Sequence, residues 1–160
     1  MVRKIESTDA QVICDIYNYY IEKTIITFEE EPVSESEMKG RIQSSKLPWL
    51  VFEENNKILG YAFASEWKAR CAYRFSVEVS IYLVHKKTGR KIGTTLYEEL
   101  ISRLKKLKYH SLIAGIALPN EASVKFHEKF RFEKVAHFKK VGYKFNQFID
   151  VGYWQLDLNE

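Results

Sequence analysis

Residues 73–95 read YRFSVEVSIYLVHKKTGRKIGTT, and they join two patterns of different kinds. In residues 73–84 apolar and polar side chains alternate, which predicts a strand with one apolar face. The other face carries a carboxylate and hydroxyl groups. The apolar face holds Phe75, Val77, Val79 and Ile81, and the opposite face holds Ser76, Glu78, Ser80 and Tyr82.

The strand is followed by a loop, residues 85–93, with five basic or histidine side chains and two glycines. A helix is predicted over residues 92–108, and its inner face holds Leu96, Leu100, Ile101 and Leu104. A helix N-terminus presents unpaired N–H groups, and glycine lets such amides approach phosphate oxygens. On these residues alone the loop is either a diphosphate site or an ordinary solvated loop, because basic loops are common on protein surfaces.

Further elements are predicted on both sides of this unit. An Asn55-Asn56 turn joins two strands into a hairpin, and Ser34 to Glu37 form a capping-box pattern. Residues 24–31 are rich in β-forming side chains. The expected strands are 2–6, 49–53, 58–67, 111–117, 132–141 and 150–157, and the expected helices are 12–21, 34–44 and 121–130. This order predicts an α+β fold in α/β/α layers, with a mixed, mostly antiparallel sheet.

Composition limits the possible functions. The 160 residues fit a single domain, 1–160, and the 46% of hydrophobic residues suffice for its core. A net charge of +4 without a long basic tract gives no nucleic-acid footprint. No apolar run approaches the roughly 20 residues of a membrane span, and no signal peptide is evident, so we expect a cytoplasmic protein without a membrane partner. Neither Cys14 nor Cys71 has metal-ligand spacing, and we expect no metal.

The strand–loop–helix unit, together with Leu118 to Glu128, resembles the GCN5-related N-acetyltransferase (GNAT) superfamily. The resemblance is closest to its phosphinothricin and methionine sulfoximine acetyltransferase branch, and it covers essentially the whole chain. Other segments that carry it are 15–18, 27–28, 48–51, 67–70, 142–144 and 150–155. It implies an enzyme that moves an acetyl group from acetyl-CoA to a small amino-acid-like amine. It also implies central strands that splay apart.

The resemblance implies a binding site for acetyl-CoA. The backbone of the first splayed strand would pair with the pantetheine arm, the loop amides would take the diphosphate, and the turn after the later strand would contact the arm. The residues at these positions are Ile81, Tyr82, Leu83, Gly89, Arg90, Lys91, Ile92, Gly93, Thr94, Asn120 and Ser123.

Two residues are candidates for proton transfer. An acceptor amine is mostly ammonium at neutral pH and must lose a proton, and Glu78 matches the base of the branch. From its position alone, Glu78 is equally an exposed strand residue paired with Arg74 or a lysine. His127 stands where the branch carries a candidate general acid. The alternative for His127 is a packing or capping role in the helix.

For the acceptor, the resemblance implies cations that clamp a carboxylate and aromatic rings that wall a side chain. The candidates are Thr27, Phe28, Lys68, Arg70, Tyr73, Arg74 and Lys144. These can also be ordinary residues of a pocket rim. In dimeric relatives Lys144 and its neighbours approach the partner's site, so a homodimer is expected.

The sequence departs from the superfamily pattern at three places. In the loop motif Gln/Arg-x-x-Gly-x-Gly/Ala, Thr88 replaces the Gln/Arg and Lys91 replaces the first glycine. Arg131 replaces a glycine that suits a left-handed helix C-cap. Residues 145–149 lack the usual His, Gly and Trp, which affects acceptor preference. The loop changes motivate one alternative, a non-catalytic acyl-CoA-binding domain, and a peptide or protein N-acetyltransferase is another.

Overall fold

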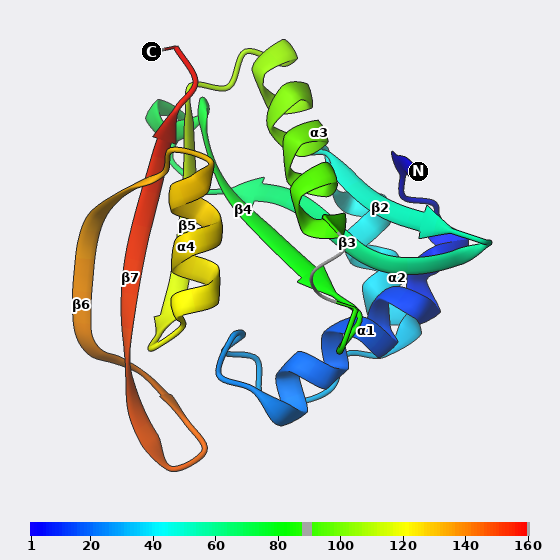
Figure 1. Ribbon diagram of the computed structural model, residues 1–160, viewed down its shortest axis with the longest axis horizontal. Coiled ribbons are helices and arrows are strands. Elements are labelled where there is room, and N and C mark those ends of the chain that lie inside the picture. The colour runs from blue at the N-terminus through cyan, green and yellow to red at the C-terminus, as the bar shows by residue number, and fades with distance from the viewer. Residues whose placement is uncertain (88–90, 160) are drawn as a thin grey trace.

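The computed structural model describes residues 1–87 and 91–159. They form a mixed seven-stranded sheet in the order β1-β2-β3-β4-β5-β7-β6 (Figure 1). Only β4 and β5 are parallel, and the other neighbouring strands are antiparallel. The strands are β1 (Val2–Lys4), β2 (Trp49–Glu54), β3 (Lys57–Glu66), β4 (Ser76–Leu83), β5 (Ser111–Leu118), β6 (Glu133–Lys144) and β7 (Gln147–Asp157).

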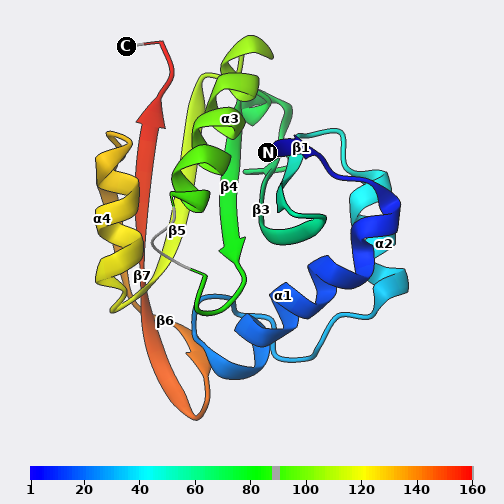
Figure 2. The ribbon, with the colours of Figure 1, turned by 45° about the vertical axis from the view of Figure 1, so that its right-hand side comes forward.

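Helices cover both faces of the sheet, which confirms the predicted α/β/α layers (Figure 2). Helices α1 (Ala10–Lys23) and α2 (Glu35–Ser44) lie on one face, and α3 (Ile92–Lys106) and α4 (Glu121–Lys129) lie on the other. Two short 3-10 turns, η1 (Ser7–Asp9) and η2 (Cys71–Tyr73), complete the elements. In the described part of the chain, no helix has the length and apolar character of a membrane span.

Each face of the sheet has its own core because side chains alternate along the strands. On β2, Leu50 belongs to the cluster that includes Leu96 and Leu100 of α3. Its neighbour Val51 belongs to the cluster that includes Ile13 of α1. Val77, Val79 and Ile81 of the apolar face predicted for β4 pack with α3, and the polar face is turned to the opposite side of the sheet. Phe75 was wrongly placed on that face, because it lies before β4 and is exposed.

Helix starts follow local sequence signals. The Oγ of Ser34 accepts a hydrogen bond from the backbone N–H of Glu37 at 3.1 Å, as the capping pattern predicts. The Oδ1 of Asn120 accepts one from the N–H of Ser123 at 3.1 Å and starts α4. Lys91 precedes α3 in the left-handed conformation, with φ 60° and ψ 8°.

Several predicted boundaries were wrong. The strand predicted over 73–84 begins only at Ser76, because residues 71–73 form a 3-10 turn. The backbone N–H of Arg74 closes this turn by donating to the carbonyl oxygen of Cys71. Residues 24–31, for which the sequence showed only β-forming side chains and no assigned element, form a connection without strand pairing that Tyr17 of α1 holds through Thr27 and Glu29. The last two strands are longer than predicted and form one hairpin, with β6 ending at Lys144 and β7 beginning at Gln147.

Strands β4 and β5 splay apart as predicted. They pair only where Ser76 to Glu78 face Ser111 to Ile113. Strand β4 then continues to Leu83 and β5 to Leu118, and Figure 1 shows the two diverging. On its other edge β4 stays paired with β3 along its length. Beyond Glu78, the edge of β4 that faces β5 is therefore open.

Candidate active site

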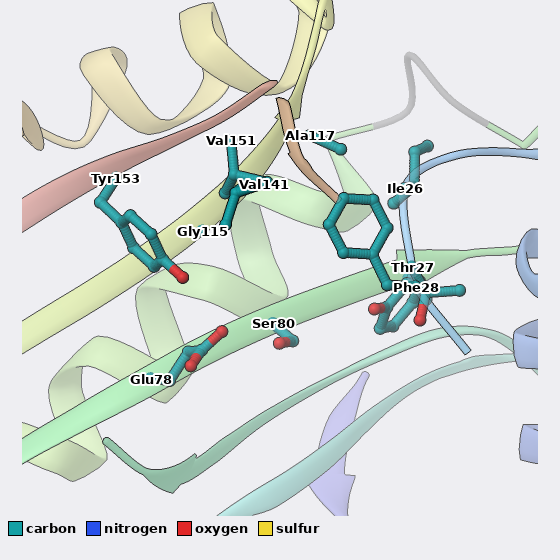
Figure 3. A pocket seen from close by; sticks show the side chains of 11 residues that line it. Ile26, Thr27, Phe28, Glu78, Ser80, Gly115, Ala117, Val141, Val151 and Tyr153 are labelled. Carbon is teal, nitrogen blue, oxygen red and sulfur yellow. The ribbon is translucent and has the colours of Figure 1, made fainter. Parts of the chain in front are cut away.

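A pocket of about 370 Å³ lies at this opening, on the face of the sheet that α1 covers (Figure 3). It is bordered by both splayed strands, by the 24–31 connection and by the β6–β7 hairpin. Its lining residues are Ile26, Thr27, Phe28, Glu78, Ser80, Tyr82, Gly115, Ala117, Val141, Val151 and Tyr153. We call it the acceptor pocket. Glu78 is its only charged lining residue among those the structure describes.

A groove of about 440 Å³ lies on the other side of β4, between α3 and α4. Its surface is mostly apolar, and the first turn of α3 and the start of α4 border it. Its lining residues are Tyr20, Ile26, Ile81, Leu83, Lys91, Ile92, Gly93, Thr94, Asn120, Ala122, Ser123 and Phe126. Ile26 borders both hollows, so they adjoin at the open end of the splay.

The alternation along β4 separates the two hollows. Glu78, Ser80 and Tyr82 line the acceptor pocket, whereas Ile81 and Leu83 line the groove. This is the two-faced strand that the sequence pattern predicts. A ligand held along the open edge of β4 would thus lie between the groove and the carboxylate of Glu78.

The carboxylate of Glu78 is in an unusual environment. Burial raises its pKa, and the positive charge of Lys68 opposes that shift. Glu78 forms no ion pair with Arg74. The guanidinium of Arg74 instead donates a hydrogen bond to the carbonyl oxygen of Cys71 and lies over the ring of Phe75. A half-buried carboxylate with a raised pKa at a pocket wall is a candidate general base.

The 24–31 connection forms the wall opposite the hairpin. The hydroxyl of Thr27 shares a hydrogen bond of 2.8 Å with Tyr17, which also donates to Glu29. From the hairpin, the buried Lys144 donates to the carbonyl oxygen of Thr27 at 2.8 Å. Burial lowers the pKa of Lys144. These bonds place Thr27 at the pocket wall.

The ring of Phe28 lies directly on the backbone of Gly142. A Cβ atom at Gly142 would come within 2.4 Å of that ring. Strand β6 bulges between Phe138 and Gly142, and the carboxylate of Asp150 accepts the N–H of Lys140 inside the bulge at 2.8 Å. The bulge brings the hairpin against the 24–31 connection, and the two form a continuous wall of the acceptor pocket.

The groove has features that suit a thioester with a phosphorylated carrier. The first turn of α3 presents unpaired amides, and its dipole favours anions. Lys91 lies at that end of the helix, and the Asn120–Ser123 cap lies across the groove. The residues present therefore fit acetyl-CoA, with apolar side chains for the arm and amides plus a cation for phosphate. Thr88, Gly89 and Arg90, the remaining predicted loop residues, lie outside the described residues.

The other predicted acceptor residues are not in the pocket lining. Lys68 acts on Glu78 through its charge and lies over the ring of Trp67. Tyr73 and Arg74 are exposed in and after η2, and Arg70 precedes that turn. Lys144 holds Thr27 of its own chain. The roles of these residues toward an acceptor stay predictions.

His127 is buried on the inner side of α4 and lines neither hollow. Its Nδ1 lies 2.8 Å from the carbonyl oxygen of Ser123 and therefore donates to it. Its Nε2 then accepts from the hydroxyl of Tyr97 at 2.8 Å. Burial lowers the pKa of the imidazole. A neutral ring bonded at both nitrogens counts against the general-acid role, which stays a prediction.

Sequence reasoning missed the β7 side of the acceptor pocket. Tyr153 belongs to a segment that carries the family resemblance, but no role was assigned to it. Ser80 could have been found, because it shares the polar face of β4 with Glu78. Gly115 and Tyr153 face each other in register only after β5 and β7 are known to pair. Across the described ranges, no three His, Cys, Asp or Glu side chains gather as metal ligands would.

Fold and site together define an acyl-CoA-dependent transferase. The model of the acetyltransferase (GNAT) domain matches residues 2–152, and the chain belongs to this family. The chain is 35% identical to the phosphinothricin N-acetyltransferase of Streptomyces viridochromogenes over 158 residues, which cover 98% of this chain and 86% of that protein. It is 30% identical to the L-methionine sulfoximine/L-methionine sulfone acetyltransferase of Salmonella typhimurium, over 99% of this chain and 95% of that protein.

A solved structure shares the whole fold. The phosphinothricin acetyltransferase from Sinorhizobium meliloti, in complex with acetyl-CoA, superposes with a TM-score of 0.94 at 33% identity. The match covers 98% of this chain and 87% of that one. These comparisons confirm the family and the fold that the sequence predicts.

Proposed function

We propose that the protein transfers an acetyl group from acetyl-CoA to the amine of a small amino-acid analogue of the phosphinothricin or methionine sulfone type. One observation carries the proposal. Glu78 stands in the acceptor pocket at the point where β4 and β5 part, and the apolar groove lies on the other side of the same strand. These two types of acceptor are the ones in the names of relatives that match nearly the whole chain.

The groove would hold acetyl-CoA. Ile81, Tyr82 and Leu83 offer the open edge of β4 to the pantetheine arm, in the manner of an added strand. The amides of Gly93 and Thr94 at the start of α3 would meet the phosphates, with Ile92 packed beneath. Asn120 and Ser123 would close the opposite side. When bound, acetyl-CoA supplies an activated acetyl group that a neutral amine accepts directly, without an acyl-enzyme.

Glu78 would act as the general base. The acceptor arrives mostly as an ammonium ion, and its nitrogen becomes a nucleophile only after losing a proton. The raised pKa of Glu78 brings the carboxylate closer to the operating pH, which favours proton transfer.

The acceptor would lie between the 24–31 connection and the hairpin. Phe28 and Thr27 form one wall, and Lys68 at the Glu78 end offers a positive charge to an acceptor carboxylate. Arg70, Tyr73 and Arg74 would form the rim on that side. Lys144 would act on the acceptor only through Thr27, which makes it a positioning residue.

The test is the release of CoA thiol by the purified full chain with acetyl-CoA and either phosphinothricin or methionine sulfone. Activity that is lost in Glu78→Gln, with acetyl-CoA affinity kept in isothermal titration, supports the proposal. Binding of acetyl-CoA with no turnover on any amine would favour a non-catalytic acyl-CoA-binding domain. Activity on peptide N-termini alone would favour a peptide acetyltransferase.

We further propose a homodimer that works in the cytoplasm. The β6–β7 hairpin ends the sheet and exposes several large apolar side chains, which a second copy could cover. The most exposed of them are Val135, Phe138, Val141, Tyr143, Phe145 and Phe148. Both cysteines are free thiols, as is usual in a reducing compartment. Light scattering of the purified chain measures the oligomeric state.

A further inference from the structure

Tyr153 faces the proposed base from the opposite side of the acceptor pocket. Its side chain comes from β7, and its register partner on β5 is Gly115. Figure 3 shows its hydroxyl directed toward the carboxylate of Glu78. The two polar groups thus belong to strands on either side of the splay, and Gly115 lies between them.

Gly115 leaves a gap between these two groups. A Cβ atom at Gly115 would lie 3.1 Å from the ring atom Cε1 of Tyr153 and 3.6 Å from Oε1 of Glu78. Any side chain there would fill the space between the ring and the carboxylate. The glycine therefore keeps the space between the ring and the carboxylate open.

The ring of Tyr153 is fixed by two aromatic neighbours. Trp67 packs edge-on at 5.4 Å between centroids, and Phe138 packs edge-on at 5.8 Å. Such contacts orient a ring and leave its polar end free. The hydroxyl is therefore aimed into the pocket by packing, without help from a hydrogen bond.

The hydroxyl has no hydrogen-bond partner in the part of the chain that the structure describes. Burial, and then the negative charge of Glu78, raises the pKa of Tyr153, so the phenol stays neutral. A neutral phenol oxygen can accept a hydrogen bond as well as donate one. A half-buried hydroxyl that is oriented but unpaired suggests a ligand that pairs with it.

Building on the proposed acetyltransferase function, we propose that Tyr153 positions the acceptor amine, its phenol oxygen accepting one N–H while Glu78 accepts another. A primary ammonium group has enough N–H donors for both. With both bonds made, the nitrogen is held over Gly115, at the opening between β4 and β5. Tyr153 would then be a positioning and specificity residue for primary amines.

The test compares Tyr153→Phe with the wild type, because phenylalanine keeps the ring and its packing. Loss of one hydrogen bond from a charged ammonium group should raise the KM of the amine acceptor about tenfold to a hundredfold. The affinity for acetyl-CoA, measured by titration, should not change. Tyr109→Phe is the control, since Tyr109 lies after α3 and lines neither the acceptor pocket nor the groove.

A dead-end inhibitor distinguishes this role from a structural one. The N,N-dimethyl derivative of the acceptor, once protonated, has a single N–H, which Glu78 would take. Its inhibition constant should therefore be the same in the wild type and in Tyr153→Phe, whereas the KM of the primary amine differs. A merely structural effect would weaken both ligands together.

Gly115→Ala provides an independent measurement should Tyr153→Phe fold poorly. The added methyl group occupies the gap, so acceptor turnover should fall while acetyl-CoA binding persists. The proposal is overturned if Tyr153→Phe leaves the acceptor KM unchanged, if both ligands weaken equally, or if Gly115→Ala keeps full activity. A wild type that acetylates no amine would instead overturn the proposed function itself.

Discussion

Glu78 and Ile113 are register partners at the last position where β4 and β5 pair. Ile113 is buried in the sheet, whereas the Glu78 carboxylate stands in the acceptor pocket at the start of the opening. A shift of one residue along β4 would turn the carboxylate into the apolar core. The short parallel pairing therefore fixes both the place of the splay and the place of the proposed base.

Glu78→Gln should abolish most of the activity without harming the fold. Removal of a general base costs about 10²-fold to 10⁴-fold in kcat/KM. In the wild type, the acid limb of the kcat/KM profile should lie above the ordinary glutamate pKa of 4.5, because burial raises the pKa of Glu78. Initial rates across pH measure both effects. A variant with near-normal kcat/KM would remove Glu78 from the mechanism.

The same substitution should stabilise the protein at neutral pH. A carboxyl group whose folded-state pKa is raised favours folding below its unfolded pKa, and this contribution is lost as pH rises through the folded value. Burial of the charged form therefore destabilises the wild type near pH 7. Thermal melts of Glu78→Gln and the wild type should differ at neutral pH and converge in acid.

Gly142→Ala and Gly40→Ala should change stability in opposite directions. The added methyl group at Gly142 would lie 2.4 Å from the ring of Phe28, so the ring or the strand must move. Overpacking of this kind costs about 1–3 kcal/mol. Gly40 lies inside α2 with nothing within 4 Å of the added atom, and alanine there should stabilise the helix by about 0.5–1 kcal/mol.

The two glycine variants should also differ in activity. Displacement of Phe28 changes the acceptor wall, so Gly142→Ala should raise the acceptor KM while Gly40→Ala leaves it unchanged. Thermal melts and initial rates on the same samples measure both. Equal acceptor KM values in the two variants would show that the contact between Phe28 and the β6–β7 hairpin does not shape the acceptor pocket.

The two-faced pattern of β4 was readable in the sequence because burial repeats every second residue along a strand. The positions of Glu78 and Ile81 on opposite sides follow from that pattern alone. The 24–31 connection was not readable, because its β-forming side chains are used in contacts with α1 and the hairpin. The local pattern there does not distinguish a strand from a loop that side chains hold.

Pairings between distant strands account for the rest of the site. Tyr153 reaches Glu78 only because β7 pairs with β5 across Gly115. Lys144 looked like an acceptor ligand, yet it is buried and bonded to the carbonyl of Thr27. Both facts depend on the hairpin's register, and the sequence contains no local signal for that register.

Lys91→Gly and Arg131→Gly should each raise stability. Both residues have a left-handed backbone conformation, with φ of 60° at Lys91 and 67° at Arg131. The superfamily pattern has glycine at both positions. Relief of that conformation is worth about 1 kcal/mol per residue. For a domain of this size, that corresponds to a rise in Tm of roughly 2–4 °C.

Only Lys91→Gly should change the affinity for acetyl-CoA. Lys91 borders the groove beside the N-terminus of α3, where a phosphate would gain from its charge, and Arg131 does not border the groove. Titration of acetyl-CoA into both variants should show weaker binding for Lys91→Gly alone. Tighter binding would mean that the lysine obstructs the site.

His127 should make the stability of the fold depend on pH. Burial lowers the folded-state pKa of His127 below its ordinary value of 6.5, so the unfolded chain binds the proton more readily. Stability is then greatest above pH 6.5 and falls as pH drops toward the folded pKa, by at most about 1.4 kcal/mol per pH unit. Chemical denaturation between pH 7.5 and 5 measures this slope.

His127→Gln removes the titrating group, so its stability should depend less on pH over the same range. The variant also breaks the bond from Tyr97 to Nε2, and a buried hydroxyl without a partner costs about 1–3 kcal/mol. Its kcat should fall little if His127 has only this structural role. A large loss of kcat in a sample that melts normally would instead restore the general-acid role predicted from the sequence.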